Sequence, residues 1–240
     1  MEVIEDTSEF DWLRPYFKGP KGMVADDVPE HFEAYCIVMH PLFRVPVDAI
    51  RSMDTSSLPE RAQQLLAESA SVSADFDEAR AERVTWRTLC EQRGVTFEAG
   101  FTPAELGRWP DGYLTDEGTP GVEFTSALMS HVAPTTGDQE CLFWYMCPPA
   151  EFGDNVREFY KGKLDDLPSL LQDFRSPYSP TYAWPSDRNW VVHCDYDSSY
   201  TVVAASKSVI ASIEADDRLE TLRLMPDTEW RLRPASAVKT

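Results

Sequence analysis

Residues 189–205, NWVVHCDYDSSYTVVAA, consist of two apolar and β-branched runs separated by the polar stretch DYDSS. Val and Tyr favour strands, whereas Asp and Ser favour tight connections because their side chains bond to the neighbouring backbone. The segment therefore predicts a β-hairpin with its turn at residues 195–199. Since side chains alternate along a strand, we expect one face to carry Trp190, Val192 and Cys194 and the other to carry Val191, His193 and Asp195.

Three polar residues of this hairpin are the candidate catalytic residues: His193, Asp195 and Asp197. His193 and Asp195 are two positions apart and share a strand face, so their side chains can form a hydrogen bond. Such a pair would either tune a general base or satisfy a polar surface.

The pair Asp195 and Asp197 also suggests three kinds of metal-dependent site. A haloacid-dehalogenase-like nucleophile would follow an apolar strand as Asp195 does, but Ser199 replaces the usual Thr or Val and too little chain follows for that family's remaining motifs. A calcium loop starting at Asp195 requires Gly and Glu where Tyr200 and Ser206 stand, so it is excluded. A nucleotide-sugar site built on D-x-D has no other support in the chain. A hairpin loop is the simplest interpretation.

The chain lacks the spacing of common metal, thiol and hydrolase sites. Its five cysteines are an odd number without a C-x-x-C pair, which predicts reduced and mostly buried thiols. No G-x-S-x-G elbow or glycine-rich phosphate loop occurs, and no flanking signature selects one of the four histidines. His40 is expected to be half-exposed at a strand end, and His131 to lie on a helix surface. We expect no metal and no cofactor.

The composition predicts a folded, acidic and cytoplasmic protein. The 240 residues are 42% hydrophobic and 12% aromatic, which is enough for a sizeable core. The start, MEVIEDTSEF, lacks the basic and apolar regions of a signal peptide, and no apolar run is long enough to cross a membrane. The net charge of −19 would repel nucleic acid and anionic lipid, so we expect neither as a partner. This charge fits either simple solubility or complementarity to a basic protein.

The elements before residue 139 are predicted from hydrophobic pattern and caps. The apolar run at residues 34–39, closed by a proline, is typical of a buried strand. Residues 51–98 are rich in helix formers and contain the helix stop Gly94, which predicts a helical insertion. TPAE at residues 102–105 has the pattern of a capping box before a short helix, and residues 119–133 predict a longer helix.

Residues 139–233 are expected to form a C-terminal β-rich unit. ECLFWYMCPP predicts a central strand, NVREFYKG a second strand, and KLDDLPSLLQDF a short amphipathic turn or helix. The proline-rich RSPYSPTYAWPSDRNW predicts a rigid connection into the hairpin. Beyond the hairpin, Ser206 caps a predicted helix and RLETLRL alternates as an edge strand. The prediction is one α+β domain, residues 1–240, with a mixed or antiparallel sheet, flanking helices and the helical insertion.

Both ends of the chain resemble one protein family. VPEHFEAYCIVMHP near the start, and SPTYAWPSDRNWVVHCDYDSSYTVVAASKSVIASIEADDRLETLRL near the end, are similar to conserved actinobacterial proteins with the C-terminal pattern W-P-x-D-R-x-W, D-x-D and Y. The resemblance covers roughly the first 45 and the last 80 to 100 residues. The family has no established activity, so the resemblance implies no catalytic residue. Relatives tend to have glycine before the serine of YTVVAAS, where this chain has alanine.

Two functions are compatible with these features. The first is a non-enzymatic acidic protein-binding module, similar to an immunity or inhibitor protein that covers a basic partner. Its candidate binding residues are the aromatic side chains Trp184, Trp190 and Tyr200. The second is a metal-assisted hydrolase or transferase that uses the hairpin residues. The lack of a strong catalytic motif favours the binding module.

Overall fold

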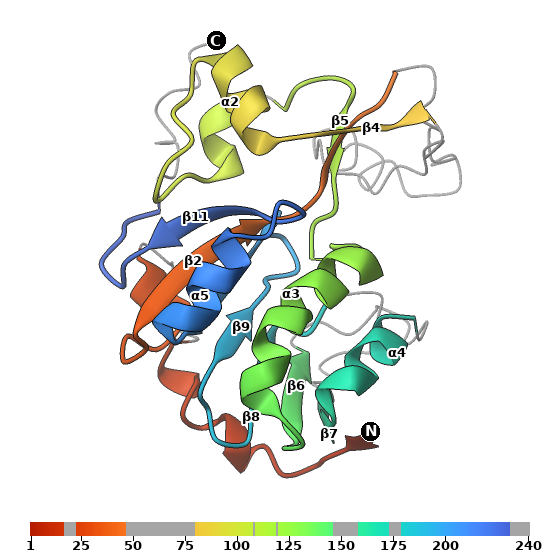
Figure 1. The fold of residues 1–240 in the computed structure, drawn as a ribbon, viewed down its shortest axis with the longest axis vertical. Helices are drawn as coiled ribbons and strands as arrows, with labels where there is room; N and C mark the ends of the chain where they lie inside the picture. The colour runs from red at the N-terminus through yellow and green to blue at the C-terminus, as the bar shows by residue number, and fades with distance from the viewer. Residues whose placement is uncertain are drawn as a thin grey trace, which may run out of the picture.

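The fold is built around one eight-stranded sheet, seen in the computed structural model of residues 1–16, 23–46, 80–107, 109–118, 120–145, 158–172 and 179–230 (Figure 1). Neighbouring strands of the sheet pair antiparallel, which confirms the predicted α+β class. Across the sheet, the strands run in the order β1 (Glu2–Val3), β7 (Glu158–Gly162), β6 (Cys141–Tyr145), β8 (Tyr182–Pro185), β9 (Val191–His193), β10 (Tyr200–Ala205), β2 (Ala34–Met39) and β11 (Glu220–Leu224).

A smaller sheet lies beyond the β11 side of the large one (Figure 1). Its antiparallel strands are β4 (Glu82–Val84), β3 (Leu42–Arg44) and β5 (Tyr113–Thr115). The helix α2 (Trp86–Arg93) follows β4, and the 3-10 helix η6 (Pro103–Leu106) precedes β5. Glu220 of β11 accepts hydrogen bonds from the amides of Trp86 and Arg87, at 2.6 and 2.8 Å. A carboxylate of the large sheet thus satisfies the first amides of α2.

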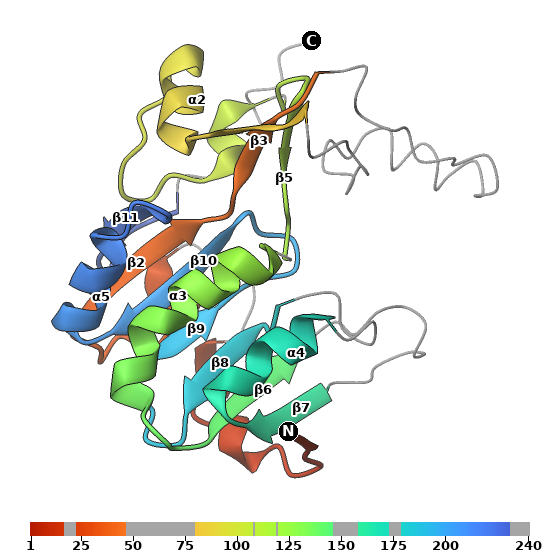
Figure 2. The ribbon, with the colours of Figure 1, turned by 45° about the vertical axis from the view of Figure 1, so that its right-hand side comes forward.

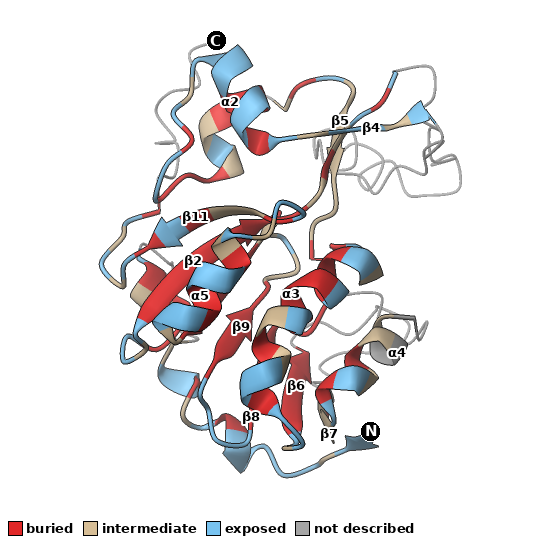
Figure 3. Ribbon diagram, in the orientation of Figure 1, coloured by how far each residue is buried: buried red, intermediate tan, exposed pale blue. Residues whose placement is uncertain are grey.

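The large sheet is buried on both faces. The helices α3 (Gly121–Thr136), α4 (Leu167–Gln172) and α5 (Lys207–Glu214) cover one face (Figure 2). The N-terminal segment, with the 3-10 helices η1 (Ser8–Phe10), η2 (Arg14–Tyr16) and η3 (Val24–Asp26), covers the other. There Phe10 stacks on Trp144 with ring centroids 4.3 Å apart. Figure 3 shows the resulting burial of the central strands and of the helix sides that face them.

Three predicted helix signals are confirmed. The Ser206 hydroxyl accepts a hydrogen bond from the Val209 amide and caps α5. Gly94 ends α2 with φ 66°, a left-handed conformation in which glycine has no steric penalty. Thr102 and Glu105 form the capping box of η6, although this element is a 3-10 helix.

The structure confirms the predicted strands and shows a further strand in the segment predicted as a proline-rich connection. β9 and β10 form the predicted hairpin, with His193 opposite Val202, β2 is a buried strand, and β11 is an edge strand. The connection is corrected, because Tyr182–Pro185 forms the strand β8 between β6 and β9. Pro185 takes the last position of β8, beyond the two residues, Tyr182 and Ala183, that pair with β9. The earlier residues 173–178 lie outside the described residues.

The helix α2 (Trp86–Arg93) confirms part of the helical region predicted at residues 51–98, and the strand β4 corrects another part. Residues 51–79 lie outside the described residues. Glu82–Val84 form the strand β4, because pairing with β3 overrides their local helix preference. The helix predicted at residues 119–133 is α3, which begins at Gly121 and continues to Thr136.

N-terminal strands complete the predicted C-terminal β-rich unit. β2 lies between β10 and β11, and β1 pairs with β7 at the opposite edge. The strands within residues 139–233 therefore share their sheet with residues 2–39 and do not form a separate sheet.

Candidate functional site

The candidate catalytic residues of the hairpin have different surroundings. His193 ends β9 and is only 4% exposed. Its Nδ1 lies 3.9 Å from Oδ1 of Asp27, a buried residue of the N-terminal segment. Asp195 is half-buried and Asp197 is exposed in the hairpin loop, residues 194–199. The histidine therefore faces the interior, whereas the two carboxylates lie in the surface loop.

The interior around His193 holds the N-terminal segment against the sheet. Trp230 Nε1 donates a hydrogen bond to Asp27 Oδ2 at 2.9 Å, and the Tyr182 hydroxyl donates to the Asp27 carbonyl oxygen at 2.8 Å. The rings of Tyr182 and His193 lie 4.4 Å apart. Burial, and then the charge of Asp27, raises the pKa of both Tyr182 and Tyr200 well above the ordinary value. These contacts are those of a packed polar interior.

The aromatic candidates for partner binding are mostly core residues. Trp184 and Trp190 are fully buried, in the cores on opposite faces of the sheet. Trp190 Nε1 donates to the Thr136 hydroxyl at 2.8 Å. Tyr200 is partly buried, with its ring 5.3 Å from that of Trp230. A partner at the surface therefore does not reach the two tryptophan rings.

A second acidic loop, residues 116–118, lies against the hairpin loop. The Gly118 amide donates to the Ser198 carbonyl oxygen at 3.0 Å. Gly118 has φ +66°, and a Cβ there would come within 2.6 Å of the backbone of Tyr196. Only glycine allows this close approach, which brings the backbone of Asp116 and Glu117 to the loop that carries Asp195 and Asp197. We call residues 116–118 and 194–199 the acidic loops.

His40 holds both acidic loops from inside. Its amide donates to the Ser199 carbonyl oxygen at 2.9 Å, and its Nδ1 donates to the Asp116 carbonyl oxygen at 2.7 Å. Since a carbonyl only accepts, Nδ1 carries the proton and Nε2 accepts from the Thr201 hydroxyl at 2.9 Å. His40 is 1% exposed, which corrects the predicted half-exposed position, and burial lowers its pKa to about 4.

Cys194 lies beside His40 but is not an activated thiol. Its Sγ is 3.8 Å from His40 Nε2. Burial raises the pKa of the Cys194 thiol to about 12, so the thiol stays protonated at neutral pH. A neutral thiol next to a neutral imidazole supports packing of the loop base and not nucleophilic attack.

The acidic loops concentrate negative charge. Although Asp197 is largely exposed, partial desolvation of its carboxylate, with a further contribution from the Asp195 charge, raises its pKa above the ordinary value. The two loops carry four carboxylates, those of Asp116, Glu117, Asp195 and Asp197, and no lysine or arginine. Chemically, this surface favours cationic groups of a partner.

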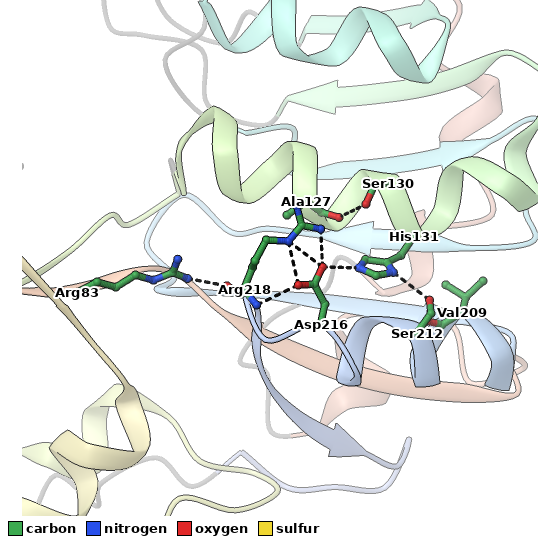
Figure 4. Close-up of polar contacts among 8 residues, drawn as sticks. All are labelled: Arg83, Ala127, Ser130, His131, Val209, Ser212, Asp216 and Arg218. Atoms are coloured by element: carbon green, nitrogen blue, oxygen red, sulfur yellow. Dashed lines mark hydrogen bonds and ion pairs between the residues drawn. The ribbon is translucent and has the colours of Figure 1, made fainter.

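A further polar cluster connects α3 with α5 (Figure 4). His131 of α3 contacts the Ser212 hydroxyl through Nδ1 at 3.1 Å and Asp216 Oδ2 through Nε2 at 2.9 Å. Arg218 Nη2 donates to Asp216 Oδ2 at 2.6 Å, and Arg83 of β4 donates to the Arg218 carbonyl oxygen at 2.6 Å. The serine, histidine and aspartate thus stand in the order of a nucleophile, a base and an orienting acid, which no sequence motif indicated.

The surroundings of this cluster favour a latch between helices over a hydrolytic site. The Ser212 hydroxyl donates to the Val209 carbonyl oxygen at 2.8 Å, so its proton is engaged within α5. Ser212 lies in the last turn of α5, where helix carbonyls carry partial negative charge that opposes a developing oxyanion. Hydrogen bonds from Arg218 hold the pKa of Asp216 well below its ordinary value. We call His131, Ser212, Asp216 and Arg218 the α3–α5 latch.

Comparison of the chain with protein-family models, curated proteins and solved structures found no match. Within the described ranges, no helix combines the length and the apolar character needed to cross a membrane. The same residues contain no group of three or more His, Cys, Asp and Glu side chains placed to hold a metal ion.

Proposed function

We propose that this protein is a non-enzymatic protein-binding module whose acidic loops engage a basic protein. The observation that carries the proposal is the hydrogen bond between Gly118 and Ser198, which joins two carboxylate-bearing loops from distant parts of the chain. His40 fixes both loops from below, so their backbones are held before a partner arrives. A preformed acidic surface loses little conformational freedom on binding, and this favours affinity.

The charge of the described residues also supports a basic partner. These residues contain 31 acidic and 12 basic side chains, a difference equal to the net charge of −19 for the whole chain. The negative electrostatic field of these residues accelerates the association with a cationic protein and slows the association with anionic ones. The expected binding therefore weakens as salt rises.

An affinity capture with matched variants tests this function. The immobilised protein is exposed to an actinobacterial lysate, chosen from the sequence resemblance, at about 50 mM and about 500 mM salt. We expect wild type to retain a basic protein at low salt, and the double variant Asp195→Asn, Asp197→Asn to lose it. The control Asp138→Asn, Asp165→Asn changes two exposed carboxylates outside the acidic loops and should retain it. Equal capture by both double variants, or capture of no basic protein, would contradict the proposal.

The alternative is a metal-assisted hydrolase or transferase at the hairpin. The raised pKa of Asp197 beside Asp195 is the observation in its favour, since closely spaced carboxylates attract a divalent ion. The enclosed position of His193 weighs against it as a base for the same site. Thermal unfolding with magnesium, manganese, calcium and zinc tests the idea. A midpoint raised in wild type but not in Asp197→Asn would support the metal site over the binding module.

A further inference from the structure

A small cavity lies beneath the first turns of α3, next to the base of the acidic loops. Its volume is about 20 Å³, and α3, the residues before β8, and the β9 and β10 hairpin all contribute to its wall. The described residues of the wall include no charged side chain, in contrast to the acidic surface of the protein. Three hydroxyl groups interrupt its otherwise apolar lining, those of Thr125, Ser179 and Thr201.

Two of these hydroxyls have no hydrogen-bond partner among the described residues. Thr125 Oγ1 and Ser179 Oγ are buried, in residues that are 4% and 9% exposed, and neither makes a hydrogen bond within the part of the chain that the structure describes. A buried hydroxyl left without a partner destabilises a fold by about 1–3 kcal/mol. Two such groups on the wall of one cavity indicate a shared ligand inside it.

The size and the polar groups of the cavity select the ligand. A water molecule needs a cavity volume of roughly 10–15 Å³, measured in the same way, and two to four polar partners. Thr201 donates its proton to His40 Nε2, and its oxygen can therefore still accept a hydrogen bond. An apolar occupant would leave the hydroxyls unpaired, and an ion would meet an uncharged wall that does not offset its desolvation.

We propose that this cavity binds one internal water molecule, held by Thr125, Ser179 and Thr201. The two free hydroxyls donate to the water oxygen, and the water donates to Thr201 Oγ1. Thr201 in turn donates to His40 Nε2, and His40 Nδ1 donates to the Asp116 carbonyl oxygen. All hydrogen bonds in this series run in the same direction, from the two free hydroxyls toward the Asp116 carbonyl oxygen. The water would therefore link Thr125 of α3 to the acidic loops.

The test compares hydroxyl-free variants with hydroxyl-retaining controls. Thr125→Val and Ser179→Ala each remove one ligand, and their combination removes both. Thr125→Ser keeps the cavity hydroxyl, and Thr135→Val makes the same change as Thr125→Val at an exposed position of α3. Magnetic relaxation dispersion of the solvent nuclei counts long-lived internal waters, and thermal unfolding measures the stability of each variant.

We expect wild type and both controls to show the long-lived water, and the double variant to lose it. The drop in unfolding midpoint of the double variant should be smaller than the sum of the two single drops, because the first substitution already disrupts the shared water. Amide exchange at His40 and Gly118 should become faster when the water is lost. If the double variant does not fold, the comparison of Thr125→Val with Thr125→Ser still decides the question.

A dry cavity would give the opposite result. Removing a hydroxyl that has no partner raises stability, so both single variants would then melt above wild type, and their gains would add. That outcome, or the absence of a long-lived water from wild type, would overturn the proposal.

Discussion

The amide of Gly118 and the carbonyl oxygen of Ser198 are joined by a hydrogen bond of 3.0 Å, which fixes the two acidic loops against each other. Gly118 adopts φ +66°, and its Cα lies so close to Tyr196 that an added Cβ would stand 2.6 Å from the Tyr196 Cα. This contact is therefore sensitive to a single methyl group.

Gly118→Ala should separate the acidic loops and destabilise the fold. Gly94 is the matched control, because it has the same φ, +66°, but open space where a Cβ would be added. The left-handed conformation alone makes Gly94→Ala unfavourable by about 1–2 kcal/mol. Gly118→Ala adds the clash with Tyr196, so chemical denaturation should show a larger loss. Equal losses for the two variants would show that the loops move apart without resistance.

His40 should make stability depend on pH between about 6.5 and about 4, its unfolded and folded pKa values. Because the folded pKa is the lower one, the unfolded chain takes up the proton first, and stability is lost as pH falls through this window. At about 1.4 kcal/mol per pKa unit, the loss is on the order of 3 kcal/mol.

Urea unfolding at several pH values measures this dependence. In His40→Gln the loss of stability across the window should shrink, although the variant is less stable at neutral pH because the bonds to Asp116 and Thr201 are removed. His31→Gln changes an exposed histidine and should keep the wild-type profile. A profile unchanged in His40→Gln would assign the pH dependence to other groups.

Glu220→Ala should weaken the attachment of α2 to the large sheet. The substitution removes the acceptor for the amides of Trp86 and Arg87 at the start of the helix. Loss of a capping interaction destabilises by about 0.5–2 kcal/mol, and amide exchange of Trp86 should accelerate more than exchange in α3. Glu91→Ala, an exposed change on the same helix, is the control. Similar losses for both variants would mean that the carboxylate of Glu220 does not hold the helix.

Asp216→Asn should remove an acid-sensitive part of the stability. Arg218 and His131 hold the folded pKa of Asp216 below its ordinary value of 3.8. For such a carboxyl the stabilisation is present above the unfolded pKa and is lost as pH falls below it. Wild type should therefore lose more stability than Asp216→Asn between pH 5 and pH 2, roughly the range in which such a carboxyl titrates. Asp217→Asn, an exposed neighbour, serves as the control, and identical acid profiles for wild type and Asp216→Asn would rule out the latch as a stabilising contact.

Features of the fold that depend on neighbouring residues could be predicted from the sequence. The Ser206 cap, the left-handed Gly94 and the strand pair of the hairpin each follow from residues only a few positions apart. The sequence predicts a connection and not a strand at Tyr182–Pro185, because Pro185, the aromatic residues and the nearby prolines Pro177 and Pro180 are typical of connections. The strand character of this segment comes from pairing with β6 on one side and β9 on the other, which no local pattern reveals.

Only part of the candidate site could be predicted from the sequence, again because the rest depends on contacts between residues far apart in the chain. Asp195 and Asp197 could be placed in a loop because the flanking runs form a hairpin. The role of His40 depends on Asp116 and Thr201, which are 76 and 161 positions away. Likewise, nothing near His131 identifies Ser212 and Asp216 as its partners. Long-range contacts of this kind are set by the topology of the sheet.

The position of β2 between β10 and β11 has a consequence for biosynthesis. β2 leaves the ribosome well before the strands on either side of it, because β10 and β11 follow it by more than 160 residues. Until those strands emerge, the backbone groups of β2 have no strand partner and its apolar side chains are not covered. Unpaired strands of this kind are prone to aggregation and slow to fold. A nascent chain stalled before residue 200 should therefore depend on a chaperone to stay soluble. Both neighbours of β2 are available for pairing only after residue 224 has emerged.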